Sequence, residues 1–179
     1  MTSSNEPKLE AILYPKGTKF DERNQWSFLL EQYKTFVNTA ENMPVRRQAM
    51  NTLFLSINVV LLSVLGVIFK EIIKVQMALI GVIALAATGT LLCISWYKLI
   101  RSSRQLNAGK FAVIHLLEQY LPAAPFTAEW EFLGKGKDKK KYVRFTQTER
   151  IIPIVLIILY VIISVWGLIS FLTFPIASA

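Results

Sequence analysis

The sequence predicts an all-α fold with three transmembrane helices and a helical cytoplasmic domain. The main observation is three long apolar runs, which cover Thr52–Phe69, Val75–Leu99 and Ile151–Leu172. At a rise of about 1.5 Å per residue, each run is long enough to cross a hydrocarbon core of about 30 Å. No Asp, Glu, Lys, Arg or His lies inside them before Lys98, near the end of the second run. Continuous apolar runs of this length favour membrane spans over the buried helices of a soluble core.

The basic residues predict which ends of the runs face the cytoplasm. They are frequent before the first run and between the second and third, whereas the first turn has only Lys70 and Lys74 and no charge follows the third run. Basic segments stay on the cytoplasmic side, so the N-terminus is expected inside and the C-terminus outside. The expected segments are a cytoplasmic N-terminal segment at 1–49, transmembrane helices at 50–70, 75–100 and 150–172, a cytoplasmic helix with a basic loop at 101–149, and a short outer tail at 173–179.

Composition agrees with this interpretation. Hydrophobic residues make up 53% of the chain and the net charge is +8. The bias of basic residues to the inner side accounts for most of that charge, so we expect no nucleic acid partner. The single cysteine, Cys93, excludes an internal disulfide. The start of the chain lacks the basic and apolar regions of a cleavable signal peptide, so the first span is expected to act as the insertion signal.

An amphipathic helix is predicted before the first span. Asp21 suits its N-cap, and Pro44 is expected to end it. Its apolar residues recur at three- and four-residue spacing and form one stripe. The stripe consists of Trp26, Leu29, Leu30, Tyr33, Phe36, Val37 and Ala40. Interfacial helices carry Lys and Arg on the polar face, but this polar face is mixed and rather acidic. We therefore expect the stripe to pack on protein, with the bilayer surface as the alternative.

The second span is predicted to continue into the cytoplasm as a helix. Between Trp96 and Tyr120 there is no proline and one glycine, Gly109, and we expect the helix to continue to about Leu121. Pro122 and Pro125 then end the helix. We expect it to pair with the N-terminal amphipathic helix as a small cytoplasmic domain.

A basic loop follows, which we expect to contact anionic lipid headgroups or a soluble partner. Each basic residue near an anionic membrane surface contributes about 1 kcal/mol to the attraction between the chain and the lipid headgroups. The alternative is a solvated loop that only enforces topology. The loop lysines are Lys135, Lys137, Lys139, Lys140 and Lys141. Beyond the loop, 142–145 alternates like a short strand, and Thr146 to Glu149 has the spacing of a capping box before the third span.

Small residues in the spans predict self-association into a ring, because they let helices approach closely in lipid. The third span, rich in Ile, Leu and Val, is expected to be the most exposed to lipid. The candidates for helix packing in an oligomer are Gly81, Ala84, Thr88 and Gly89. The candidates to line a central space are Thr52, Ser56, Asn58 and Ser63. Alternatively, these polar groups bond to their own helix or to a neighbour.

Few residues are available for chemistry. The span interiors lack the ionisable groups that ion or proton coupling uses. No phosphate-binding glycine loop, metal site or cofactor site is apparent, and we expect no catalytic residues. The remaining enzymatic alternative is lipid-modifying chemistry at the cytoplasmic face with His115, Glu118 and Glu129.

Several short motifs, taken in order, resemble RipA-like octameric membrane proteins of bacteria. They are Phe28–Lys34, Arg46-Arg47 with Asn51, Ser95-Trp96-Tyr97, Leu117-Glu118 with Leu121-Pro122, Glu129-Trp130 and Thr148–Pro153. The resemblance implies an inner-membrane protein that assembles as a ring of eight and acts in envelope homeostasis, stress adaptation or growth in a host. It supplies no reaction.

The leading hypothesis is a non-enzymatic homo-oligomeric ring that acts as a pore or a scaffold, with copies of itself and membrane lipids as partners. One alternative is an adaptor that recruits a soluble cytoplasmic partner through Trp130 and the lysine loop. The other is the lipid-modifying enzyme described above.

Overall fold

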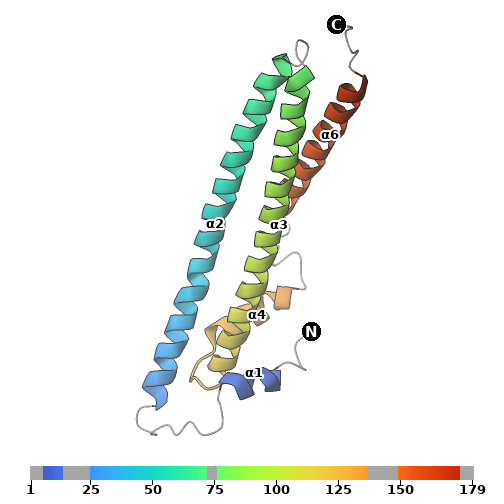
Figure 1. The fold of residues 1–179 in the computed structure, drawn as a ribbon. Helices are drawn as coiled ribbons and strands as arrows, with labels where there is room; N and C mark the ends of the chain where they lie inside the picture. The colour runs from blue at the N-terminus through green and yellow to red at the C-terminus, as the bar shows by residue number, and fades with distance from the viewer. Residues whose placement is uncertain (1–5, 14–24, 72–75, 137–148, 174–179) are drawn as a thin grey trace. The chain divides into compact units, whose positions relative to one another are not determined.

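All the elements described in the computed structural model are helices, which confirms the predicted all-α fold (Figure 1). The structure describes residues 6–13, 25–71, 76–136 and 149–173. The elements are α1 (Glu6–Leu13), α2 (Gln25–Glu71), α3 (Gln76–Glu118), α4 (Pro125–Phe132), the 3-10 helix η1 (Gly134–Gly136) and α6 (Ile151–Thr173). The predictions made for Asp21, for the strand at 142–145, for Thr146 and for the last four lysines of the basic loop lie outside the described residues.

Helices α2, α3 and α6 are long and apolar enough to cross a membrane, in agreement with the three predicted spans. Helix α6 has 23 residues, close to the roughly 20 that a span needs. Helices α2 and α3 have 47 and 43 residues, so each extends well beyond its apolar run. Helix α3 continues through Gly109 to Glu118, as predicted, and ends just before Leu121.

Helix α2 does not end at Pro44, so that prediction was wrong. A proline inside a helix removes one backbone hydrogen bond, but a helix can continue beyond it where packing holds both sides. Before the proline, Ala40 is buried with 3% of its surface exposed. After it, Arg47 forms an ion pair with Glu149. The local effect of proline is therefore outweighed by packing that the sequence pattern does not show.

The chain divides into two compact units. Unit 1 comprises residues 1–45 and 104–144, and unit 2 comprises residues 46–103 and 145–179. Helices α2 and α3 contribute to both units, α4 belongs to unit 1, and α6 belongs to unit 2.

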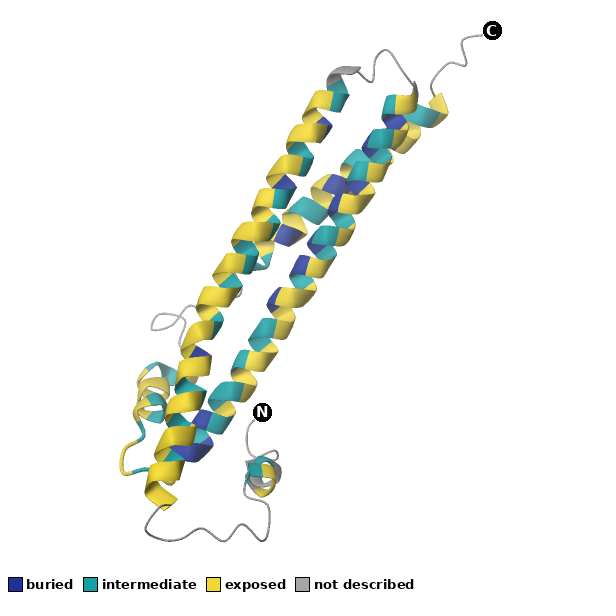
Figure 2. Ribbon diagram, turned by 60° about the vertical axis from the view of Figure 1, so that its left-hand side comes forward, coloured by how far each residue is buried: buried dark blue, intermediate teal, exposed yellow. Residues whose placement is uncertain are grey.

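In unit 1 the amphipathic helix packs on protein, as predicted. The ring centroid of Phe126 on α4 lies 6.4 Å from that of Tyr33 on α2. The same ring lies 5.9 Å, between centroids, from Phe111 on α3. Only part of the predicted stripe is covered, because Trp26 and Leu30 remain 58% and 42% exposed. Figure 2 shows the exposed faces of α2 in yellow.

In unit 2 a narrow apolar core joins α2, α3 and α6. The buried core consists of Leu65, Leu79, Val82, Ala86, Cys93 and Tyr160. On α6 the buried residues are Pro153, Tyr160 and Gly167, at a spacing of seven that places them on one side of the helix. Inside the subunit the apolar window of α6 is buried to a somewhat greater extent than that of α2, and the expectation that the third span is the most exposed to lipid stays a prediction. Hydropathy alone does not reveal which apolar side chains meet another helix.

Candidate functional site

Three polar clusters stand out because their members come from segments far apart in the sequence. The first is the Glu118 cluster in unit 1, formed by Glu118, Tyr33, Phe126, Thr127 and His115. The carboxylate of Glu118 is buried with 2% of the residue exposed. Its Oε1 accepts hydrogen bonds from the Phe126 N–H at 2.8 Å and the Tyr33 hydroxyl at 3.0 Å. Its Oε2 accepts from the N–H and the hydroxyl of Thr127, at 2.8 and 2.6 Å.

Glu118 takes the place of the missing N-cap of α4. Ala124 precedes that helix and has no side chain that could accept a hydrogen bond from its first N–H groups. Those groups have no partner inside the helix and carry the positive end of the helix dipole. The chain turns back after α3, and Pro125 starts α4 in a position that tolerates proline. The carboxylate of Glu118 therefore joins the end of α3 to the start of α4 and, through Tyr33, to α2.

The hydrogen bonds decide the protonation of Glu118. Burial by itself raises the pKa of the carboxyl group, but the bonds from Thr127, Phe126 and Tyr33 outweigh it, and the pKa lies below its ordinary value. Burial and the hydrogen bond to the neighbouring carboxylate raise the pKa of Tyr33 to about 12. At neutral pH the pair therefore consists of a carboxylate and a protonated phenol.

His115 joins this cluster through Thr127. Its Nδ1 lies 3.0 Å from the Thr127 hydroxyl oxygen and 3.8 Å from Oε2 of Glu118. Since the hydroxyl hydrogen is donated to Glu118, Nδ1 carries a hydrogen and donates it to Thr127. A hydroxyl nucleophile is activated by a base that accepts its hydrogen. The Thr127 hydroxyl instead donates to the carboxylate of Glu118, which already accepts hydrogen bonds from Phe126, Tyr33 and the Thr127 N–H. Glu129 lies exposed on α4, whereas Glu118 is buried, and the enzymatic alternative stays a prediction.

The second cluster, the Asn58 cluster, lies inside the apolar part of unit 2. Asn58 is 1% exposed, and its Oδ1 accepts hydrogen bonds from the Tyr160 hydroxyl at 3.0 Å and the Cys93 thiol at 3.2 Å. Its Nδ2 donates to the backbone oxygen of Phe54 at 2.7 Å. The amide thereby connects α2, α3 and α6 at one level. The sequence pattern suggested a central space for Asn58, but the structure satisfies its side chain within the subunit.

Gly89 belongs to this packing. A Cβ atom at Gly89 would come within 2.5 Å of the Tyr160 ring, whereas at Gly81 it would meet no heavy atom within 4 Å. Gly89 is therefore the position where the ring of α6 lies against the backbone of α3. Of the four predicted packing residues, Ala84 and Thr88 lie exposed, Gly81 is half-buried and Gly89 is buried inside the subunit.

The third cluster, the interfacial cluster, consists of Arg47, Asn51, Trp96 and Glu149, which are joined by polar contacts, together with their chain neighbours Tyr97 and Arg150, which contact each other. Glu149 Oε1 lies 3.3 Å from Arg47 Nε and accepts a hydrogen bond from Asn51 Nδ2 at 3.2 Å. Asn51 Oδ1 in turn accepts from the indole N–H of Trp96 at 2.9 Å.

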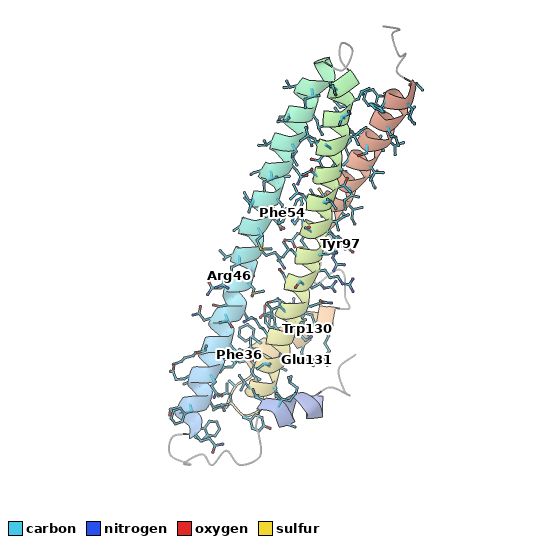
Figure 3. All side chains as sticks on the ribbon, viewed as in Figure 1. Phe36, Arg46, Phe54, Tyr97, Trp130 and Glu131 are labelled. Carbon is cyan, nitrogen blue, oxygen red and sulfur yellow. The ribbon has the colours of Figure 1, made fainter. Side chains whose placement is uncertain are left out.

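Aromatic rings support the interfacial cluster. The indole ring of Trp96 stacks on Phe54, with a centroid distance of 5.6 Å and an interplanar angle of 5°. Figure 3 labels Phe54 on α2 and Tyr97 on α3. The Arg150 guanidinium lies over the ring of Tyr97, 5.8 Å from its centroid. Sequence reasoning did not identify this cluster, although all six of its members are among the motifs on which the family resemblance depends.

The other predicted site residues lie on exposed surfaces. Thr52, Ser56 and Ser63 are exposed on α2, and the Ser63 hydroxyl donates to its own helix at the Val59 oxygen. Lys135 forms an ion pair with Glu131 at 2.6 Å. The other four lysines of the basic loop lie outside the described residues.

Comparison with known proteins gives one match. The model of the octameric membrane protein family (8xMP) matches residues 30–169, a range that contains all three clusters. No curated protein and no solved structure matches the chain. The family description and the three apolar helices agree on a multi-pass membrane protein.

We expect the Gly89→Ala substitution to destabilise unit 2 by about 1–3 kcal/mol, because the added methyl group overpacks the buried Tyr160 ring. Thermal unfolding of the purified protein in detergent measures the change. Gly109→Ala on the same helix is the control, because its Cβ would meet no neighbour within 4 Å. Equal stability of the two variants would contradict the close contact.

We expect Glu118→Gln to lower the free energy of unfolding by about 1–3 kcal/mol, because an amide offers one acceptor oxygen where two backbone N–H groups need partners. Since the folded pKa of Glu118 is lowered, its stabilisation is complete above the unfolded pKa and is lost as pH falls through the folded value. The difference between the variant and the unaltered protein should therefore shrink in acid. Urea unfolding at several pH values measures it, and Glu129→Gln on exposed α4 should show neither effect.

Proposed function

Because the chain belongs to the octameric membrane protein family, we propose that it assembles as a homo-octameric ring in the bacterial inner membrane and acts there as a non-enzymatic scaffold. The distribution of basic residues supports a cytoplasmic location for unit 1. The resemblance to RipA-like proteins supports a role in envelope homeostasis or in adaptation to stress or a host.

The observation that carries the proposal is that unit 2 leaves two small-residue faces uncovered. Polar side chains such as Asn58 find partners inside the subunit, whereas the small residues point away from its core. In lipid, faces of small residues are where helices approach one another closely. The exposed residues are Thr52, Ser56, Ser63 and Gly66 on α2, and Ala84, Thr88 and Ser95 on α3.

The hydroxyl groups on these faces favour packing over a water-filled lumen. Ser63 donates to Val59 O at 2.8 Å, and Thr88 donates to Ala84 O at 2.9 Å. Ser95 donates to Leu91 O at 3.0 Å. A hydroxyl that bonds to its own helix no longer needs water, so the face can lie against another helix in lipid.

Two faces on different helices suit a ring. If the α2 face of one subunit packs on the α3 face of the next, the contact is heterologous and can be repeated until the ring closes. A single self-complementary face would instead produce a dimer.

We expect Ala84→Phe combined with Thr88→Phe to convert the octamer into smaller species, because two large rings would prevent close approach at the α3 face. Native mass spectrometry or electron microscopy in nanodiscs without imposed symmetry measures the subunit number. Val161→Phe combined with Val165→Phe is the matched control, since both positions are exposed on α6 and keep the same spacing. An intact octamer in the α3 variant would exclude this face as the subunit contact.

A pore is the second candidate function, favoured by the exposed hydroxyl residues Thr52 and Ser56 near one end of the α2 span. If the ring conducts, a Ser56→Cys variant should lose conductance in planar bilayers when a charged, water-soluble thiol reagent is added. The native Cys93 is buried and leaves the background unreactive. Val161→Cys on α6 should keep its conductance. If the ring shows no conductance before modification, the pore is excluded and the scaffold is the remaining candidate function.

A further inference from the structure

The interfacial cluster has unused hydrogen-bonding capacity of both kinds. Among the residues that the structure describes, the buried atoms Arg47 Nε, Glu149 Oε2 and Arg150 Nε have no hydrogen-bond partner. Arg47 Nε is close enough to Glu149 for an ion pair, but its N–H does not form a hydrogen bond there. Unpaired groups of this kind are costly and require a water, an ion or a ligand. Two of the three atoms are donors and the third is an acceptor.

The position of the cluster indicates a lipid. Arg47 and Asn51 directly precede the apolar run of α2, and Glu149 and Arg150 directly precede α6. Trp96 and Tyr97 lie at the end of the apolar run of α3. These are the levels at which phospholipid headgroups and interfacial aromatic residues lie.

The surface next to the cluster suits acyl chains. The first turns of α6 carry apolar side chains that the subunit covers only in part, since 42–57% of their surfaces are exposed. These side chains are Ile151, Ile152, Ile154 and Val155. A headgroup held by the cluster would thus place its chains along α6.

We propose that the interfacial cluster binds one phospholipid with a phosphoethanolamine headgroup. The guanidinium groups of Arg47 and Arg150 hold the phosphate, which arginine recognises well through its several N–H groups. The ammonium group donates to Oε2 of Glu149, the carboxylate oxygen without a partner. The two side chains of the ion pair remain partly accessible, with 18% of Arg47 and 11% of Glu149 exposed.

The pairing of a phosphate with a hydrogen-bond donor sets the selectivity. Phosphatidylcholine carries the same phosphate, but its quaternary ammonium has no hydrogen to donate to Glu149. Phosphatidylglycerol donates through hydroxyl groups and lacks the positive charge that complements the carboxylate. We therefore expect phosphatidylethanolamine to bind about tenfold more tightly than either lipid, the ratio expected for one hydrogen bond to a charged group.

Native mass spectrometry of the full-length protein, titrated with the three lipids of equal acyl chains, tests the proposal. Arg150→Gln should weaken the binding of phosphatidylethanolamine about tenfold, because it removes a phosphate ligand and leaves the Arg47–Glu149 pair intact. Arg46→Gln is the matched control, since Arg46 is the exposed neighbour of Arg47 and the change of charge is the same. If Arg150→Gln does not fold, Arg150→Lys should retain the charge and show a smaller loss.

Equal binding of phosphatidylethanolamine and phosphatidylcholine, or an equal loss in the Arg46 and Arg150 variants, would overturn the proposal and leave water as the partner of the unpaired atoms. Tighter binding of phosphatidylglycerol would overturn the role of Glu149. Binding of O-phosphoethanolamine at millimolar concentration without any binding of phosphatidylethanolamine would show that the site takes a soluble headgroup and not a membrane lipid. These outcomes do not depend on the subunit number, so they are separable from a failure of the octamer.

Discussion

The fold of the membrane-spanning unit depends on a single buried amide. Hydrocarbon offers no hydrogen-bonding partners, so a polar side chain inside an apolar helix must find one on protein. Asn58 finds the hydroxyl of Tyr160 and the thiol of Cys93, and each lies on a different helix. Gly89 then allows the tyrosine ring to reach this position. The amide thus fixes the rotation of the three apolar helices about their axes. Dispersion contacts alone would specify this rotation poorly.

The same constraint organises unit 1 in a more polar setting. Helix α4 begins without a capping side chain, and the buried carboxylate of Glu118 accepts the N–H groups that this leaves open. Tyr33 adds a hydrogen bond from α2. In both units, a polar group buried by packing obtains its partners from segments distant in sequence. The resulting clusters hold the subunit together, and the remaining surfaces are available to lipids and to other copies of the chain.

Those surfaces are of two kinds. The α2 and α3 faces carry small residues, and the hydroxyls of Ser63 and Thr88 among them bond to their own helices, which suits close contact between subunits. The start of α6 carries large, exposed apolar residues beside a charged cluster with unpaired atoms, which suits a phospholipid. A ring that holds lipids at its periphery and packs subunits through small faces is consistent with both surfaces.

The sequence by itself determined the helical class, the three spans and the continuation of α3 beyond the membrane, because each depends on local hydropathy and on helix-breaking residues. It did not determine that α2 passes through Pro44, because packing on both sides outweighs one lost backbone hydrogen bond. Nor did it determine the roles of Asn58, Gly89 and Glu118. Periodicity assigned Asn58 and Gly89 to faces of their own helices, whereas both contact Tyr160 on α6, which lies about 70 or more residues further along the chain. Only the tertiary structure decides such pairings, because a hydrogen bond or a close contact depends on which helices become neighbours and at what rotation.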